Sequence, residues 1–125
     1  MVKENFRKLV LASGISVVAG KNAEMNEQVI KQTEKNEYVL HTKAPGSPFC
    51  NIKEDSKEVS KDDLYETAIF CAKFSQAWKK SRVKKDIEVH VFLGSDIFKQ
   101  KDMRTGTFGV KKFKNIIVKK QDIEN

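Results

Sequence analysis

The chain has 125 residues, of which 39% are hydrophobic and 33% are charged, and its formal net charge is +7. Such a composition is typical of one globular domain and excludes a disordered or collagen-like chain. No apolar run approaches the roughly 20 residues of a membrane span, and residues 1–8 lack the apolar core of a secretory signal. We therefore expect a cytoplasmic protein with no membrane partner. The positive charge favours a polyanion, either nucleic acid or an acidic protein surface.

The first half of the chain predicts four strands around one helix. Ser13 and Gly14 form a hairpin turn signal between the first two strands. Asn22 fits the N-cap of a helix over residues 23–35, and the tripeptide Pro45-Gly46-Ser47 marks a turn. The four apolar runs that predict strands are residues 6–11, 15–19, 37–41 and 49–52.

The second half begins with a charged loop over residues 53–61. Ser60 and Asp63 have the spacing of a capping box, and they introduce a helix over residues 61–81 with a stripe of small and apolar side chains. We expect the last two strands to pair as a hairpin and residues 121–125 to fray. The strands predicted after the helix are residues 87–93, 107–110 and 115–119.

This order of elements, β-β-α-β-β-α-β-β-β, predicts one α+β domain. Short connections favour antiparallel pairing of neighbouring strands, so we expect a mostly antiparallel sheet with two main helices packed against it. The single domain should occupy residues 1–125, with its core within residues 6–120.

Three motifs follow one another in the N-terminal half. Gly20-Lys21-Asn22 stands between the second strand and the first helix, His41 ends the third strand, and Pro45-Gly46-Ser47 follows it. This arrangement resembles the RNA-binding domain of the NFACT proteins, once catalogued as a domain of unknown function, and the resemblance extends over residues 6–120. The departures from the family pattern are Val39 in place of an aromatic residue and Pro48 in place of a histidine.

The resemblance implies a role in the ribosome-associated quality control of stalled translation. NFACT proteins carry further domains that recognise the stalled large subunit and support tail addition, and 125 residues are too few to hold them. We therefore expect a stand-alone form of the RNA-binding domain. The partners that the resemblance implies are ribosomal or transfer RNA, the ribosome, or a quality-control protein.

The resemblance also implies which residues of the N-terminal motifs contact RNA. A glycine, a lysine and a helix N-terminus can together hold one phosphate, although the same residues also suit a plain capped turn. His41 is either a ligand contact or a hydrogen-bonded structural residue. The positions implied by the resemblance are Lys21, Asn22, Asn26, His41 and Ser47.

Basic residues cluster after the long helix, in the polar loop that follows the next strand, and beside the last strands. Trp78, Phe108 and Phe113 are interleaved with them, a combination that suits single-stranded or looped RNA, whose bases can stack. Alternatively, these aromatic residues belong to the core and the lysines only keep the domain soluble. The basic residues that we assign to an RNA surface are Lys79, Lys80, Arg82, Lys99, Lys101, Arg104, Lys111 and Lys112.

Chemistry beyond binding has little support in the sequence. Cys50 and Cys71 lie in apolar stretches and the two histidines are far apart, which matches neither an activated thiol nor a metal site. We therefore expect no catalysis, no metal and no cofactor. The leading hypothesis is a non-catalytic RNA-binding module, and the alternative is an adaptor that docks on an acidic protein. The sequence does not distinguish RNA from DNA, because phosphate contacts are common to both.

Overall fold

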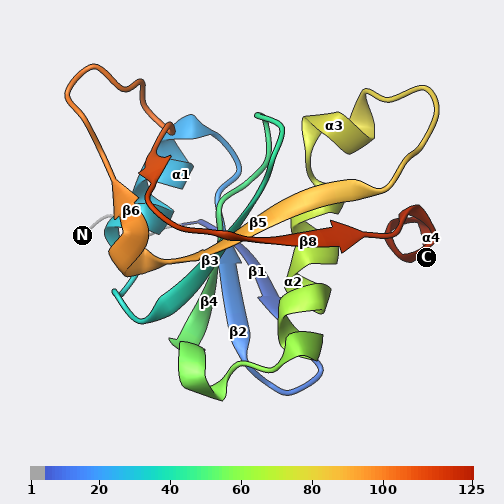
Figure 1. Cartoon of the computed structure of the whole chain (residues 1–125), viewed down its shortest axis with the longest axis horizontal. Helices are drawn as coiled ribbons and strands as arrows, with labels where there is room; N and C mark the ends of the chain where they lie inside the picture. Colours follow the sequence, from blue (N-terminus) through green and yellow to red (C-terminus); the bar gives the residue numbers. More distant parts are fainter. Residues whose placement is uncertain (1–4) are drawn as a thin grey trace.

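The computed structural model describes residues 5–125 (Figure 1). Residues 1–4 lie outside this part of the chain. The structure therefore does not test what we expect of them, namely the start of the domain and the absence of a secretory signal. Within residues 5–125, no helix is both long enough and apolar enough to cross a membrane.

A six-stranded antiparallel sheet forms the centre of the molecule, in the strand order β1-β2-β4-β3-β5-β8. Strand β3 pairs with both β4 and β5, so the strand that carries His41 runs through the middle of the sheet. Two short strands, β6 (Ile97–Phe98) and β7 (Gly109–Val110), form a second sheet. The strands of the main sheet are β1 (Arg7–Val10), β2 (Ser16–Ala19), β3 (Glu37–Thr42), β4 (Cys50–Asp55), β5 (Ile87–Leu93) and β8 (Lys114–Val118).

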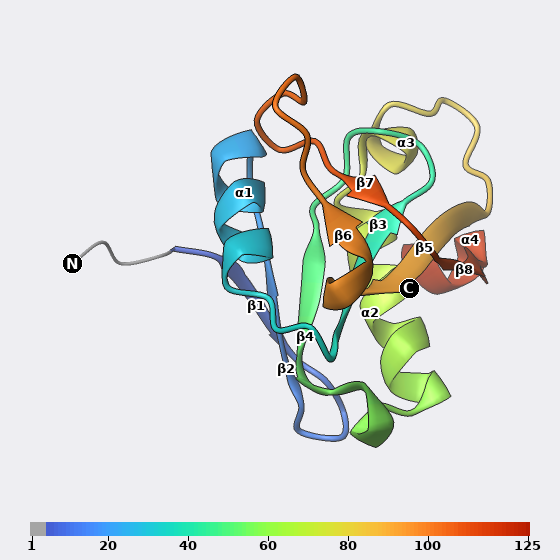
Figure 2. The ribbon, with the colours of Figure 1, turned by 60° about the vertical axis from the view of Figure 1, so that its left-hand side comes forward.

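The two main helices, α1 (Ala23–Lys31) and α2 (Lys61–Lys73), cover opposite faces of this sheet (Figure 2). Strand side chains alternate between the faces, so Leu40 belongs to the apolar cluster under α2 while its neighbour Val39 belongs to the cluster under α1. The cluster under α1 is the smaller of the two. The predicted α+β class, the antiparallel sheet and the two main helices are confirmed.

Both main helices begin at the predicted caps. The Asn22 side chain accepts a hydrogen bond from the Met25 backbone N–H at 2.8 Å. Ser60 and Asp63 form a complete capping box, in which each side chain accepts from the other residue's backbone N–H at 3.0 Å. The Asp63 carboxylate also accepts from the Ser13 hydroxyl at 2.7 Å, so the cap of α2 holds the β1–β2 turn.

The single helix predicted over residues 61–81 is wrong, because α2 ends at Lys73. The buried Ser75 hydroxyl donates to the Ala72 carbonyl at 2.7 Å and accepts from the Trp78 N–H at 3.2 Å. A serine that bonds nearby backbone in this way competes with the helical ladder, so it ends α2 and caps a separate helix, α3 (Gln76–Lys79).

Two other predicted boundaries differ from the structure for similar reasons. Helix α1 stops at Lys31 instead of residue 35, because the Gln32 and Thr33 side chains both donate to the Val29 carbonyl. The loop predicted over residues 53–61 begins later, since β4 continues to Asp55 and is followed by the short 3₁₀ helix η1 (Ser56–Glu58).

The hairpin predicted from residues 107–110 and 115–119 is also wrong. Strand β7 pairs with β6, whereas β8 pairs with β5 at the edge of the main sheet. Val110 packs on the cluster under α1, while Ile116 and Val118 belong to the cluster under α2. The two segments therefore belong to different sheets, β7 to the two-stranded sheet and β8 to the main sheet.

The frayed tail predicted for residues 121–125 is corrected as well. Residues Lys120–Glu124 form helix α4, and Ile123 is only 2% exposed within the cluster under α2. The Asp122 carboxylate accepts a hydrogen bond from the Tyr65 hydroxyl of α2 at 2.5 Å. One apolar side chain and one polar contact thus hold the end of the chain on the fold.

Candidate nucleic-acid interface

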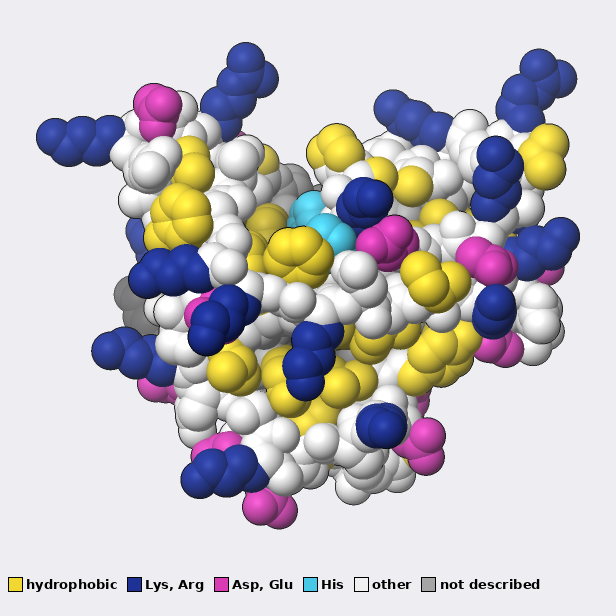
Figure 3. All heavy atoms as spheres, viewed as in Figure 1, with side chains coloured by type: hydrophobic (Ala, Val, Ile, Leu, Met, Phe, Trp, Pro, Cys, Tyr) yellow, Lys and Arg dark blue, Asp and Glu magenta, His cyan; other side chains and the backbone are white. Residues whose placement is uncertain are grey.

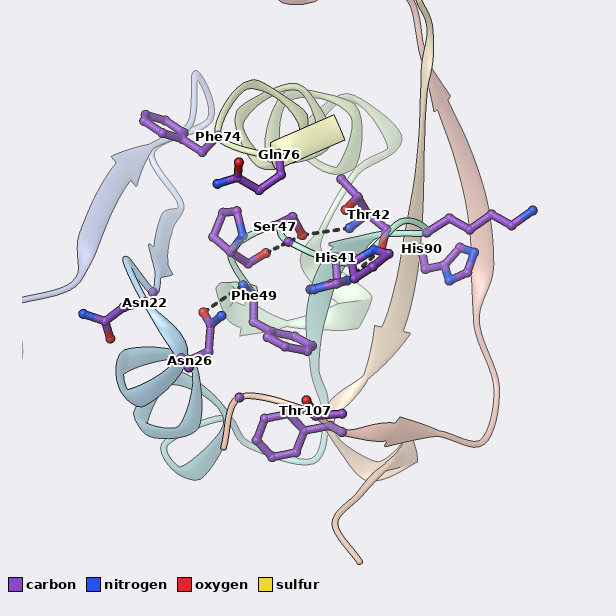
Figure 4. Close-up of a pocket in the computed structure, with 18 of the residues that line it drawn as sticks. Asn22, Asn26, His41, Thr42, Ser47, Phe49, Phe74, Gln76, His90 and Thr107 are labelled. Atoms are coloured by element: carbon purple, nitrogen blue, oxygen red, sulfur yellow. Dashed lines mark hydrogen bonds between the residues drawn. The ribbon is translucent and has the colours of Figure 1, made fainter. Parts of the chain in front are cut away.

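A pocket of about 630 Å³ opens on the face of the sheet that α1 covers in part (Figure 4). Its floor comes from β3, β5 and Phe49, the residue before β4, and one wall comes from the junction of β2 and α1. The remaining walls are the turn over residues 43–48, the start of α3 and the segment over residues 106–108. The pocket therefore gathers segments that are far apart in the sequence.

The wall at the β2–α1 junction contains the Gly20-Lys21-Asn22 motif and Asn26. The side-chain oxygen of Asn26 accepts from the Phe49 backbone N–H at 3.1 Å, and its side-chain nitrogen finds no hydrogen-bond partner within residues 5–125. A Cβ atom on the buried Gly20 would lie 2.2 Å from that same Asn26 oxygen. Glycine is therefore required at position 20 by its contact with Asn26.

His41 lies on the floor of the pocket, with its ring 4.3 Å from the Phe49 ring, centroid to centroid. Its Nδ1 atom is 2.7 Å from the Thr42 carbonyl oxygen, so we assign the proton to Nδ1 and leave Nε2 as a hydrogen-bond acceptor. Burial lowers the pKa of His41 below its ordinary value, and the Thr42 carbonyl opposes this effect only in part. The imidazole is thus neutral at pH 7.

A second histidine, His90, lies opposite His41 in the pairing of β3 with β5. Its ring stacks on Phe113 at 4.1 Å with an angle of 21° between the planes, and Phe113 is 51% exposed. Burial lowers the pKa of His90 too, although the Glu88 carboxylate acts in the opposite direction. Two neutral imidazoles therefore occupy one side of the pocket.

The Pro45-Gly46-Ser47 turn forms a wall of the pocket, but the polar groups described below are bonded within the protein. The Ser47 hydroxyl accepts from the Thr42 N–H at 3.0 Å and donates to the Pro48 carbonyl at 3.1 Å. Gly46 has a φ of 94°, a value that favours glycine, and its carbonyl accepts from the Gln76 N–H at 2.8 Å. Ser47 thus lines the pocket, but its hydroxyl is engaged within the turn.

Every charged side chain lining the pocket within residues 5–125 is basic: Arg7, Lys21, Lys43 and Lys79. The Arg7 guanidinium donates to the Gly20 carbonyl at 2.9 Å and lies 4.4 Å from the centre of the Phe74 ring. The Lys79 ammonium lies 5.6 Å from the centre of the same ring. Arg7, Lys21 and Lys79, which we call the cationic corner, form no ion pair within the described residues.

Lys99, which the sequence assigned to an RNA surface, has contacts inside the protein instead. Its ammonium donates to the Glu27 carboxylate at 2.7 Å and to the carbonyls of Thr107 and Arg104 at 2.8 and 2.5 Å. The Glu27 carboxylate also accepts from the Gly106 N–H at 2.7 Å. Lys99 therefore ties the loop that forms one pocket wall to α1.

Six further basic residues that the sequence assigned to an RNA surface lie outside the pocket lining and are exposed. Figure 3 shows basic side chains projecting on both sides of a hollow in which histidine is visible. Trp78 packs against the cluster under α2, so of the three predicted aromatic residues only Phe108 and Phe113 line the pocket. The exposed basic residues beyond the lining are Lys80, Arg82, Lys101, Arg104, Lys111 and Lys112.

Several lining residues were missed in the sequence. His90 alternates with the apolar residues of β5, and pairing β5 with β3 would have placed it beside His41. Arg7 and Phe74 have no comparable local signal, because β1 and the residue after α2 are far apart in the sequence and meet only in the folded chain. The missed residues that line the pocket include Arg7, Lys43, Phe74, Gln76, His90 and Thr107.

Groups suited to metal binding or thiol chemistry are not found in the described part of the chain. No three His, Cys, Asp or Glu side chains within residues 5–125 are grouped to hold a metal ion. Cys50 and Cys71 are free and buried, and burial raises the pKa of the Cys50 thiol well above its ordinary value. The geometry of the pocket is that of a binding site lined by cations, aromatic rings and uncharged polar side chains.

Comparison with known proteins gives three findings. The family model described as the NFACT protein RNA binding domain matches residues 5–112. The archaeal Rqc2 homolog aRqcH of Methanocaldococcus jannaschii is 43% identical over 77 residues, which cover 61% of this chain and 11% of that protein. The solved C-terminal part of the fibronectin/fibrinogen-binding protein from Streptococcus suis has a TM-score of 0.83 and 18% identity, over 99% of this chain and 49% of that one. The last likeness shows a shared fold.

Proposed function

Because the chain belongs to the family of NFACT protein RNA binding domains, we propose that it is an RNA-binding module whose contact surface is centred on the pocket. The observation that carries this proposal is the lining of the pocket, where the charged side chains of the described residues are all basic and stand beside aromatic rings. Cations hold phosphates, and aromatic rings hold bases that have left the stack. The exposed lysines and arginines around the pocket extend the surface for a longer RNA.

The finer part of the proposal concerns the partner. We take it to be ribosomal or transfer RNA in the cytoplasmic quality control of translation. The support is the identity of 43% with a protein named as an Rqc2 homolog, together with the NFACT motifs of the N-terminal half. Since the chain spans only 11% of that relative, we limit the proposal to RNA binding.

The test is fluorescence anisotropy with labelled structured RNA, single-stranded RNA and duplex DNA over a salt series. We expect the tightest binding to RNA, persisting at physiological salt. Lys21→Ala should weaken binding and reduce the salt slope by about 0.7 on a single strand, because one phosphate contact is lost. The control is Lys57→Ala, which removes the same charge from the exposed 3₁₀ helix at the other end of β4.

Two results would contradict the proposal. Equal and weak binding to all three nucleic acids, lost at physiological salt, would show that only the net charge attracts them. Equal losses in Lys21→Ala and Lys57→Ala would show that binding is not centred on the pocket. The first result would favour an acidic protein as the partner, and a pull-down that survives nuclease treatment would then identify it.

A further inference from the structure

We infer that the pocket holds a single unstacked nucleotide, with its phosphate at the cationic corner and its base against the rings of His41 and Phe49. The inference rests on the proposed function, because we take the nucleotide to be part of a bound RNA. One part of the cavity binds the phosphate and another part binds the base, and a single nucleotide reaches both.

The cationic corner has the composition of a phosphate site. Arg7 and Lys79 are both held near the Phe74 ring, and Arg7 donates to the Gly20 carbonyl, which directly precedes Lys21. Three cations thus gather at one end of the pocket without a carboxylate partner in the described chain. Like charges gathered in this way repel one another, and a bound anion relieves that repulsion.

The floor of the pocket has the composition of a base site. His41 and Phe49 lie together there, and Phe108 meets Phe49 edge to face at 5.4 Å, so the rings are fixed against one another (Figure 4). Among the polar atoms that line the pocket, two are available to the base: the acceptor Nε2 of His41 and the side-chain nitrogen of Asn26, whose oxygen is bonded to the Phe49 N–H. A base offers both a flat face for the rings and donors and acceptors on its edge.

The shape of the pocket selects an unstacked nucleotide over a duplex. Its volume of about 630 Å³ is within the range of roughly 300–1,000 Å³ found for small-ligand sites. A double helix presents its phosphates outward and keeps its bases stacked inside, so it cannot place a base on this floor. A carboxylate of an acidic protein would satisfy the cationic corner but would leave the rings and the two polar atoms without a matching group.

The experiment is a ¹H–¹⁵N NMR titration of the full chain with the four nucleoside 5′-monophosphates, their nucleosides and inorganic phosphate. We expect nucleotides to shift the amide signals of Lys21, Asn26, His41 and Phe49 in a saturable way. Nucleosides and inorganic phosphate, which reach only one part of the pocket each, should bind at least about tenfold more weakly. Equal affinity for nucleotides and inorganic phosphate would overturn the inference, since the base would then contribute nothing.

A pair of double variants separates the pocket from general charge. Lys21→Ala with Lys79→Ala removes two exposed cations of the corner, and Lys57→Ala with Lys61→Ala removes two exposed cations at the other end of the molecule. The first pair should weaken mononucleotide binding about tenfold, and the second should leave it unchanged. Equal effects of the two pairs would overturn the inference.

Parallel anisotropy with single-stranded RNA distinguishes this inference from the proposed function. RNA binding without saturable mononucleotide binding would overturn the single-nucleotide site and leave the RNA-binding module in place. Saturable mononucleotide binding without RNA binding would support the site and contradict the module. Failure of both measurements would overturn both.

Discussion

His41 and His90 face each other on neighbouring strands, and burial is the main reason that the pKa of each is lowered. Burial lowers the pKa of both imidazoles, and the Nδ1 proton of His41 is held by the Thr42 carbonyl. The family resemblance left His41 open as a structural or a ligand-binding residue. The bond of Nδ1 to the Thr42 carbonyl fixes Nε2 as an acceptor, so the structural bond leaves Nε2 available for the proposed contact with a base.

These shifted pKa values predict that stability falls in mild acid. The unfolded chain, whose histidines titrate near pH 6.5, takes up protons before the folded chain does. The free energy of unfolding should therefore decrease as the pH falls from about 7 toward the lowered pKa values of the folded state, by at most about 1.4 kcal/mol per pH unit for each histidine. Urea denaturation between about pH 7.5 and 5.5 measures this slope.

His41→Gln is the variant that assigns this slope. Glutamine keeps a polar side chain but does not titrate, so the variant should lose the contribution of His41 and retain that of His90. The carboxylates with lowered pKa values, such as Asp63, titrate at lower pH and do not contribute in this window. If the variant keeps the same slope of unfolding free energy against pH, the pKa of His41 is not lower in the folded chain than in the unfolded chain.

At the scale of the element, the short helix α4 completes the core at the end of the chain. Ile123 is 2% exposed under α2, whereas Ile117 on the edge strand β8 is 48% exposed. Ile123→Ala should reduce the free energy of unfolding by about 2–4 kcal/mol, because a buried isoleucine leaves a cavity. The matched change Ile117→Ala should cost less than about 1 kcal/mol, and urea denaturation of both variants measures the difference. Similar losses would contradict the packing of α4.

Elements with a strong local pattern could be predicted from the sequence, and those held by distant contacts could not. The alternation over Ile87–Leu93 and the capping box at Ser60 and Asp63 are local, and both appear as predicted. The break at Ser75 depends on its burial, because an exposed serine would have left its hydroxyl to water. Ile123 is a single apolar residue in a polar tail, so the sequence shows no periodic pattern there. Its burial is explained only by the cluster under α2 that it packs against.

At the scale of the whole molecule, the pocket could be predicted only in part. Lys21, Asn26 and His41 come from motifs that resemble a family pattern, and they do line one cavity. The cationic corner also needs Arg7 from the first strand, which reaches the pocket because β1 and β2 pair and place it beside Gly20. The net charge of the sequence does not show which basic residues line the pocket and which, like Lys99, form contacts within the protein.

The distribution of charge predicts how salt acts on RNAs of different length. Four cations line the pocket, so an RNA of about three nucleotides should show a slope of log affinity against log salt no steeper than about −3. A longer RNA also reaches the exposed basic residues around the pocket, and its slope should be steeper. Lys111→Gln with Lys112→Gln should reduce the slope of the long RNA by up to about 1.4 and leave that of the short RNA unchanged. Anisotropy over a salt series measures both slopes. Equal slopes for the two lengths would show that bound RNA does not extend beyond the pocket, and the surrounding lysines would then serve solubility alone.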